Sequence, residues 1–278
     1  MFKLENNFAS VEVSEQAAEV VSFFNKENNK EYMWKGDPKY WAGRNPILFP
    51  IVGNTYNKKY TLYGKEYAFK TNHGFTRNAK FKCVKSDGNE IIMRLEDDED
   101  TYSQYPFHFT LDAIYKLDGK VLTITYVITN NDEKDMPFGF GLHPAFNCPL
   151  NENETIKDYY IKFTNNEDNK NLIGDFELKG DRIDLSYEIF EGNETIVFEN
   201  INSLYVSLTN GKNGVKVSAM GYKWFAIWTK NNFPFVCLEP WHSHTDFEEV
   251  KVDFDKREGT IILKPNNSYT TSYTIEIF

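Results

Sequence analysis

Residues 224–247 read WFAIWTKNNFPFVCLEPWHSHTDF. The two apolar runs in this stretch, Trp224–Trp228 and Phe233–Leu238, predict buried strands. Glu239 follows the second run, and Pro240 has no N–H to donate, so we expect that strand to end at Glu239. A carboxylate at the mouth of a buried strand is partly desolvated, which raises its pKa and suits it to proton transfer. The same residues equally allow a solvated carboxylate at a strand end.

The composition of the chain predicts a globular protein with a large core. Its 278 residues include 23 Phe, 17 Tyr and 5 Trp, and large all-β folds often use this length as a single domain. We therefore expect one domain over residues 1–278. The net charge of −10 argues against nucleic acid or an anionic membrane as a partner, because phosphate binding needs a basic field. One local arginine site for a single phosphate remains compatible with that charge.

Cysteine usage and the N-terminus predict a cytoplasmic protein. The three cysteines are an odd number, are widely spaced and include no CxxC motif, as expected for reduced thiols. The first residues, MFKLENN, lack the apolar segment of a signal peptide. No run of about 18 apolar residues occurs that would span a membrane.

Alternating residues predict strands over much of the chain. Val121–Thr129 alternates most clearly, with Leu122, Ile124, Tyr126 and Ile128 on one face. Tyr60–Phe69 predicts a hairpin that turns near Gly64 and Lys65. The acidic run Glu96–Asp100 predicts a solvated loop, since it lacks the glycine and the terminal glutamate of an EF-hand. With no long amphipathic helix and no fixed repeat, the sequence predicts an all-β fold, a large β-sandwich.

Three further motifs carry polar groups at the ends of predicted strands. Arg44 lies in GRNPILFPIVG, His73 in NHGFTRN and His143 in GLHPAFN. The planar fork of Arg44 suits hydroxyl or phosphate recognition, but a structural pairing with a carboxylate explains it equally well. A single histidine after a strand is more often a surface or structural residue, and the loop tryptophans Trp34 and Trp41 line a pocket or cap the core.

Several chemistries lack their motifs. The chain has no Gly-rich phosphate loop, no G-x-S-x-G and no H-E-x-x-H. His242, His244 and Asp246 would chelate a metal if they shared one strand face, but many H-x-H pairs are incidental, and we expect no metal. One glutamate and two histidines remain, a set that suits proton transfer on a polar small molecule.

The chain resembles the aldose 1-epimerase (galactose mutarotase-like) family in four segments that occur in the same order. These are the segments around Arg44, His73 and His143 and the segment Leu238–His242. Their sequences are most similar to the branch typified by LacX. The resemblance implies a large antiparallel β-sandwich, the galactose mutarotase-like supersandwich. It also implies a cofactor-free isomerase that interconverts the α- and β-anomers of a sugar. By the same resemblance, Glu239 is the general base and His143 the general acid.

The resemblance also implies binding roles. His73 resembles the second histidine of the site, while Arg44 and Arg77 stand where related proteins bind substrate. Apart from the resemblance, Trp241 is expected beside the sugar because an indole face suits the C–H face of a sugar ring. No aspartate matches the one that galactose enzymes of the family use, so the sugar is not identified. The two arginines also resemble the hexose-6-phosphate 1-epimerase branch, and a non-catalytic sugar-binding protein is a further alternative. The sequence leaves the oligomeric state open.

Overall fold

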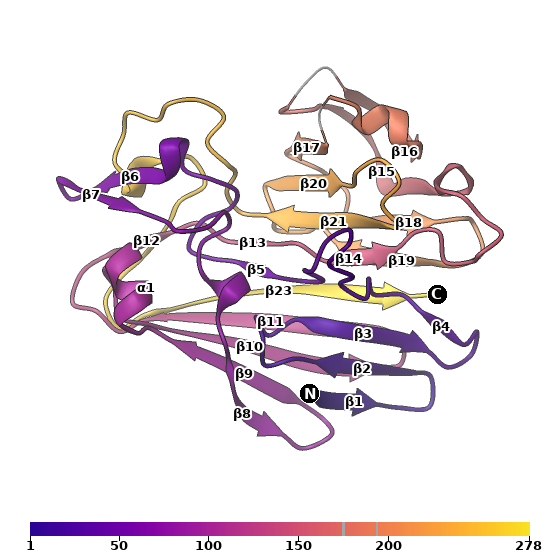
Figure 1. Ribbon diagram of the computed structural model, residues 1–278, viewed down its shortest axis with the longest axis horizontal. Coiled ribbons are helices and arrows are strands. Elements are labelled where there is room, and N and C mark those ends of the chain that lie inside the picture. The colour runs from indigo at the N-terminus through magenta and orange to yellow at the C-terminus, as the bar shows by residue number, and fades with distance from the viewer. Residues whose placement is uncertain (174–175, 193) are drawn as a thin grey trace.

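The structure is a computed structural model that describes residues 1–173, 176–192 and 194–278. It is built from antiparallel strand pairs, and its largest element is a sheet of nine strands (Figure 1). In spatial order these strands are β16 (Glu177–Asp184), β15 (Tyr160–Lys170), β18 (Tyr205–Thr209), β19 (Gly214–Ser218), β23 (Ser268–Ile277), β11 (Val121–Asn130), β10 (Phe109–Asp118), β9 (Ile91–Glu96) and β8 (Lys82–Ser86).

The centre of this sheet follows directly from the alternating sequence. Leu122, Ile124, Tyr126 and Ile128 of β11 are buried to within 1% of full burial, as their spacing predicts. The hairpin of β10 and β11 turns at Gly119, whose φ of +57° lies in the left-handed region that glycine adopts without strain. Because side chains alternate between the two faces of a strand, every second side chain of β11 enters the core.

Two smaller sheets complete the sandwich. The four-stranded sheet contains β1 (Phe2–Glu5), β2 (Ala9–Val13), β3 (Val20–Asn25) and β4 (Lys30–Glu31). The six-stranded sheet contains β17 (Thr195–Glu199), β20 (Trp224–Trp228), β21 (Phe235–Trp241), β13 (Gly141–Leu142) and β5 (Ile47–Leu48), with β14 (Ala145–Asn147) also paired to β21. Strand β1 contacts β9 and β10, and β21 contacts β18, so both smaller sheets lie against the large one. The predicted all-β sandwich is confirmed.

Two two-stranded sheets and several short helices connect these sheets. The pairs are β6 (Lys59–Leu62) with β7 (Lys65–Ala68) and β12 (Met136–Phe138) with β22 (Ile261–Leu263). The predicted hairpin is thus confirmed, with its turn at Tyr63 and Gly64, one residue earlier than expected. The helices are α1 (Glu99–Gln104) and the single turns η1 (Tyr56–Lys58), η2 (Thr76–Asn78), η3 (Ile156–Asp158), η4 (Tyr187–Phe190) and η5 (Phe254–Lys256).

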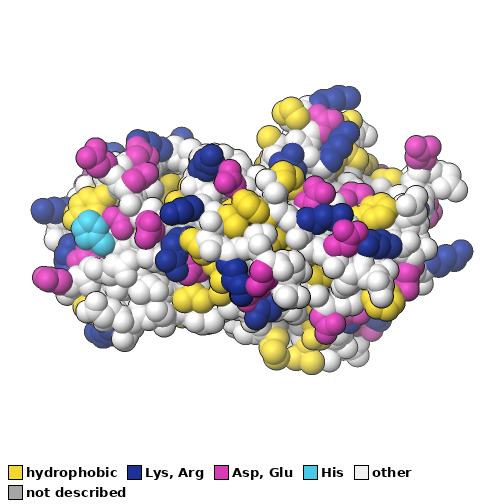
Figure 2. Space-filling view, turned by 90° about the horizontal axis from the view of Figure 1, so that it is seen from below, with side chains coloured by type: hydrophobic (Ala, Val, Ile, Leu, Met, Phe, Trp, Pro, Cys, Tyr) yellow, Lys and Arg dark blue, Asp and Glu magenta, His cyan; other side chains and the backbone are white. Residues whose placement is uncertain are grey.

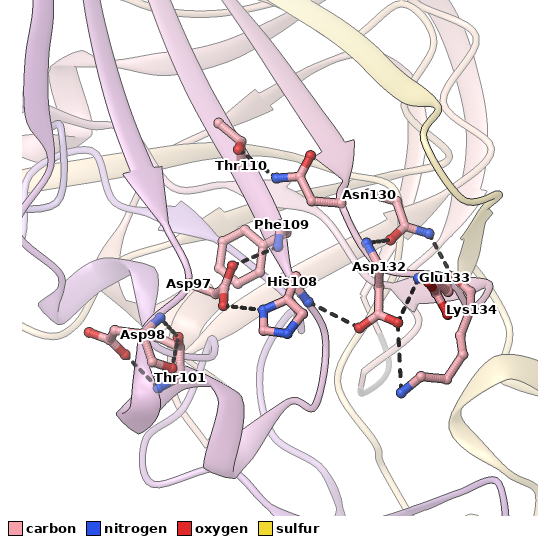
Figure 3. Close-up of polar contacts among 11 residues, drawn as sticks. Asp97, Asp98, Thr101, His108, Phe109, Thr110, Asn130, Asp132, Glu133 and Lys134 are labelled. Carbon is pink, nitrogen blue, oxygen red and sulfur yellow. Dashed lines mark hydrogen bonds and ion pairs between the residues drawn. The ribbon is translucent and has the colours of Figure 1, made fainter.

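The acidic run has a structural explanation (Figure 3). Asp98 caps α1 by accepting a hydrogen bond of 2.8 Å from the backbone N–H of Thr101. Asp97 accepts 3.0 Å from the backbone of Phe109 and lies 2.7 Å from Nδ1 of His108. The predicted loop is therefore too long, because Glu96 ends β9 and a helix begins at Glu99.

Charges of both signs intermingle on the face of the molecule shown in Figure 2. In the part of the chain that the structure describes, no helix is long and apolar enough to cross a membrane.

Candidate active site

Strand β21 and its neighbours place the two predicted proton-transfer residues opposite each other. The β13–β14 segment pairs with β21 at Gly141–Trp241 and again at Ala145–Cys237. His143 lies midway between these two points in the register, and Glu239 is the residue opposite it. Opposite residues of neighbouring antiparallel strands place their Cβ atoms on the same face, about 4.5–5.5 Å apart. Residues 96 positions apart in the sequence thus share one position on the sheet.

The predicted end of the strand at Glu239 is wrong, because β21 continues through Pro240 to Trp241. The backbone N–H groups of Leu238 and His242 donate to the β13–β14 side, at Pro144 and Phe140. The missing N–H of Pro240 therefore points to the same side, where that segment is interrupted around His143. The proline removes a hydrogen bond only where the neighbouring strand is broken.

Each face of this sheet has a separate role. Phe225, Ile227 and Leu238 belong to the main core, against the nine-stranded sheet, whereas Ala226 and Cys237 pack in separate small clusters with the tryptophans of the other face. Glu239 shares the face of Cys237, because side chains two positions apart along a strand point the same way.

Burial determines the electrostatics of the pair. Nε2 of His143 lies 3.4 Å from Oε1 of Glu239, and the two residues are 8% and 1% exposed. Desolvation raises the pKa of Glu239 well above its ordinary value, and the nearby Trp241 indole lowers it by a smaller amount. Desolvation, with smaller effects of His73 and Arg77, lowers the pKa of His143 well below its ordinary value.

Aromatic rings fix the orientation of His143. The Trp41 ring stacks on the imidazole at 4.8 Å between centroids, and Trp228 meets it edge-on at 5.4 Å. The indole N–H of Trp34 donates to the backbone carbonyl of Trp41 at 2.8 Å. Of the two loop tryptophans, Trp41 thus lines the site, whereas Trp34 is buried and supports it.

His73 is held in one protonation state by the backbone. The ring Nδ1 of His73 accepts a hydrogen bond of 2.9 Å from the backbone N–H of Gly53. The backbone N–H of His73 donates to the Gly53 carbonyl at 2.7 Å. The proton of the neutral ring is therefore on Nε2. Burial and then the charge of Arg77 lower the pKa of His73 to about 3, so the ring is neutral at physiological pH. Its centroid lies 5.6 Å from that of His143.

The two predicted arginines have different surroundings. Arg77 lines the same cavity as both histidines, and burial lowers the pKa of its guanidinium. Arg44 instead donates from Nε to the Lys35 carbonyl at 2.9 Å, and its Nη1 lies 3.6 Å from Glu19. The buried Glu19 carboxylate also accepts the backbone N–H of Arg44 and of Asn45, at 2.7 and 3.0 Å. These contacts fit the second of the two interpretations of Arg44, a structural pairing with a carboxylate.

A cavity of about 320 Å³ joins most of these groups. Its lining comprises Tyr40, Trp41, Pro46, His73, Arg77, His143, Thr195, Trp228, Lys230, Phe233, Glu239 and Trp241. Five of the six predicted site residues line this cavity. The sixth, Arg44, is not among its lining residues in the described part of the chain. Trp228 and Lys230 were not predicted. For Trp228 a signal existed, because Trp224, Ala226 and Trp228 alternate and place a small residue opposite Glu239.

The motif His242-x-His244-x-Asp246 is divided among different contacts. His242 Nε2 lies 3.1 Å from the Tyr269 hydroxyl, and His244 Nδ1 lies 2.7 Å from the Thr245 carbonyl. Asp246 accepts 2.6 Å from Nη1 of Arg257 and 2.8 Å from the backbone of Tyr56. Among the described residues, these three side chains do not form a group with ligand atoms close enough to hold a metal.

Comparison with known proteins agrees with this geometry. The model of the family described as aldose 1-epimerase matches residues 1–276. The plasmid protein LacX of Lactococcus lactis subsp. lactis is 32% identical, over 99% of this chain and 98% of its own length. The galactose mutarotase related enzyme of Lactobacillus acidophilus superposes with a TM-score of 0.91 at 29% identity, covering 100% of this chain and 97% of that one. A galactose mutarotase-like protein of Lactobacillus casei ATCC 334 gives 0.92 at 26% identity, with 100% of both chains covered. The chain belongs to the aldose 1-epimerase family.

Proposed function

We propose that this protein is an aldose 1-epimerase that interconverts the α- and β-anomers of a hexose without a cofactor. The observation that carries the proposal is the opposition of His143 and Glu239 at 3.4 Å on the wall of a cavity. The volume of that cavity, about 320 Å³, falls within the usual range of small-molecule sites, about 300–1,000 Å³. The indole rings of Trp41 and Trp228 offer apolar faces to the C–H groups of a sugar ring.

The reaction needs one proton shared by the pair. The opposite pKa shifts place this proton on Glu239 in the resting pair, and its transfer across the 3.4 Å contact to His143 gives the reactive form. In that form Glu239 is a carboxylate and takes the proton of the C1 hydroxyl, while His143 protonates the ring oxygen. The C1–O5 bond breaks, and C1 becomes the aldehyde carbon. After rotation about C1–C2, the O5 hydroxyl returns its proton to His143 and attacks the opposite face of C1. The new O1 then takes the proton from Glu239, so protons and bonds balance over the cycle.

The remaining groups bind and orient the sugar. His73 offers the Nε2–H of a neutral ring to a sugar oxygen, since its Nδ1 is engaged by Gly53. Arg77 offers the donors of a guanidinium from the same wall. For Arg44, a role in substrate binding stays a prediction that rests on the family resemblance.

A sugar phosphate is a second candidate substrate, and one observation favours it. Two cationic side chains, Arg77 and Lys230, line the cavity. Lys230 also lies 2.8 Å from the Glu194 carboxylate, and both side chains are about half exposed, so a phosphate would compete with that pairing. Arg77 and Lys230 are the two cationic residues of the cavity lining that we propose for a phosphate, whereas the Arg44 and Arg77 pair stays the prediction from the sequence.

Polarimetry distinguishes these functions. Freshly dissolved α-glucose, α-galactose and α-glucose 6-phosphate are each followed with and without protein. Faster relaxation of a free hexose supports the first proposal, and acceleration confined to the phosphate supports the second. Sugar binding without acceleration of any of the three would instead support a non-catalytic binding protein.

A further inference from the structure

A free thiol lies beside the proposed proton-transfer pair. Cys237 precedes Glu239 by two residues on β21, so both side chains are on the face that carries His143. Cys237 is fully buried and is one of three free cysteines. Neither proton transfer nor sugar binding, as proposed above, uses this sulfur.

The three side chains have the geometry of a chelating set. One ligand atom from each of His143, Cys237 and Glu239 lies within 4.8 Å of the other two. Zn–N, Zn–O and Zn–S bonds of about 2.0–2.3 Å place neighbouring tetrahedral ligands roughly 3.3–3.8 Å apart. The distance of 3.4 Å between His143 and Glu239 already falls in that range. A side-chain adjustment of about 1 Å would bring the sulfur in.

Two ligand atoms in this group lack partners. Nδ1 of His143 and Oε2 of Glu239 are buried without a hydrogen-bond partner of normal geometry among the residues described. A buried polar atom without a partner costs about 1–3 kcal/mol. A cation held by both oxygens of Glu239 would satisfy Oε2, whereas Nδ1 of His143 faces away from a cation bound to Nε2. The strand neighbours of two of these ligands are small, because Ala145 pairs with Cys237 and Ala226 with Glu239.

We propose that His143, Cys237 and Glu239 bind one thiophilic divalent cation of the Zn²⁺ class and that this cation blocks the proton-transfer pair. Thiolate, imidazole and carboxylate are together the ligands that Zn²⁺, Co²⁺ and Cd²⁺ accept, whereas Mg²⁺ and Ca²⁺ prefer oxygen alone. Three protein ligands leave the fourth position facing the cavity. The cation engages the carboxylate and imidazole that would otherwise exchange protons with a sugar, and this inhibition rests on the proposed function. Binding itself does not.

Cobalt tests the binding without reference to activity. Co²⁺ is added to the chelator-treated full-length protein, and the thiolate-to-cobalt charge-transfer absorption is followed. We expect one equivalent to bind with this absorption in the unmodified protein and in Cys83→Ser, which removes a partly exposed thiol on β8. Cys237→Ser should lose the absorption and bind Zn²⁺ more than about tenfold less tightly, since even partners of metal ligands are worth roughly 10–100-fold. Thermal unfolding of each variant checks that it is folded.

The inhibition has its own readout. Each variant's mutarotation rate in Zn²⁺ is divided by its own metal-free rate. In the unmodified protein, we expect the Zn²⁺ concentration that halves the rate to equal the midpoint of Zn²⁺ binding. In Cys237→Ser, we expect half-inhibition to require a Zn²⁺ concentration more than about tenfold higher. Absence of the charge-transfer absorption in the unmodified protein, or its persistence in Cys237→Ser, would overturn the site. Full activity with Zn²⁺ bound would overturn the blocking role. A protein without mutarotase activity that still binds Co²⁺ through Cys237 would disprove the proposed function and leave the cation site standing.

Discussion

His143 and Glu239 occupy opposite positions on neighbouring antiparallel strands, with Nε2 of the histidine 3.4 Å from Oε1 of the glutamate. The sheet register therefore sets their separation, and the stacked Trp41 ring fixes the imidazole. An acid and a base held this way need little reorganisation to reach one sugar ring.

The pair predicts a broad pH optimum. Burial lowers the pKa of His143, so a doubly protonated pair loses its first proton only at acidic pH. Burial raises the pKa of Glu239, so the last proton leaves well above the ordinary range of a carboxylic acid. The pair holds the single proton that the reaction needs throughout the interval between. We expect kcat/KM, corrected for the uncatalysed rate, to be flat through neutral pH and to fall on either side. A fall centred near the ordinary histidine pKa, about 6.5, would contradict this assignment.

His73 should be a neutral hydrogen-bond donor at every pH at which the enzyme works. Its Nδ1 accepts from Gly53, and its pKa is lowered to about 3. Nitrogen NMR should show Nδ1 unprotonated and Nε2 protonated from neutral pH down to about pH 4. His73→Phe should raise KM and also lower kcat, because the Nε2–H is expected to contact the ring oxygen. Protonation of His73 near pH 6 would rule out this role.

Arg77 and Arg44 should respond differently to removal. Arg77→Ala removes a cavity donor, and a hydrogen bond from a charged group is worth about 1.5–3 kcal/mol, or roughly 10–100-fold in KM. Arg44→Ala removes a partner of the buried Glu19 and should mainly lower the free energy of unfolding, by about 1 kcal/mol. Steady-state kinetics and urea unfolding of both variants measure the difference. A larger increase in KM for Arg44→Ala would show that this residue binds the substrate.

Gly141 should be needed for the position of Trp241. A Cβ at residue 141 would lie 2.8 Å from Cδ1 of Trp241 and 2.8 Å from Cγ2 of Val52. Gly141→Ala should therefore displace the indole, lower the free energy of unfolding by about 1–3 kcal/mol and weaken sugar binding. Denaturant unfolding together with Trp fluorescence checks this. Unchanged stability and an unchanged spectrum would show that the indole is not confined by this contact.

Part of the fold was predictable because local patterns determine it. The alternation of Val121–Thr129 specifies which side chains enter the core, and glycine near residue 64 specifies a hairpin turn. The end of β21 was not predictable, because the tolerance for Pro240 depends on the interruption of a strand nearly 100 residues earlier. Single-sequence patterns do not contain that pairing.

The site shows the same division. The histidines and Glu239 were identified by motif, yet their opposition depends on a register that no local pattern encodes. The guanidinium of Arg44 suits either substrate or carboxylate, and only the distant Glu19 reveals the contact it makes. Lys230 was missed because a lysine after an apolar strand resembles any solvated strand end.

The most direct test of the central claim is polarimetry with Glu239→Gln, using the hexose that the unmodified protein accelerates most. The substitution keeps the shape of the side chain and removes the base, so the rate should fall by roughly 10²–10⁴-fold. Sugar affinity, measured by calorimetry, should change little. Glu167→Gln is the matched control, because Glu167 is also buried but accepts from Ser203 on a different part of the molecule. Anomerisation by Glu239→Gln at the rate of the unmodified protein would contradict the assignment of Glu239 as the base.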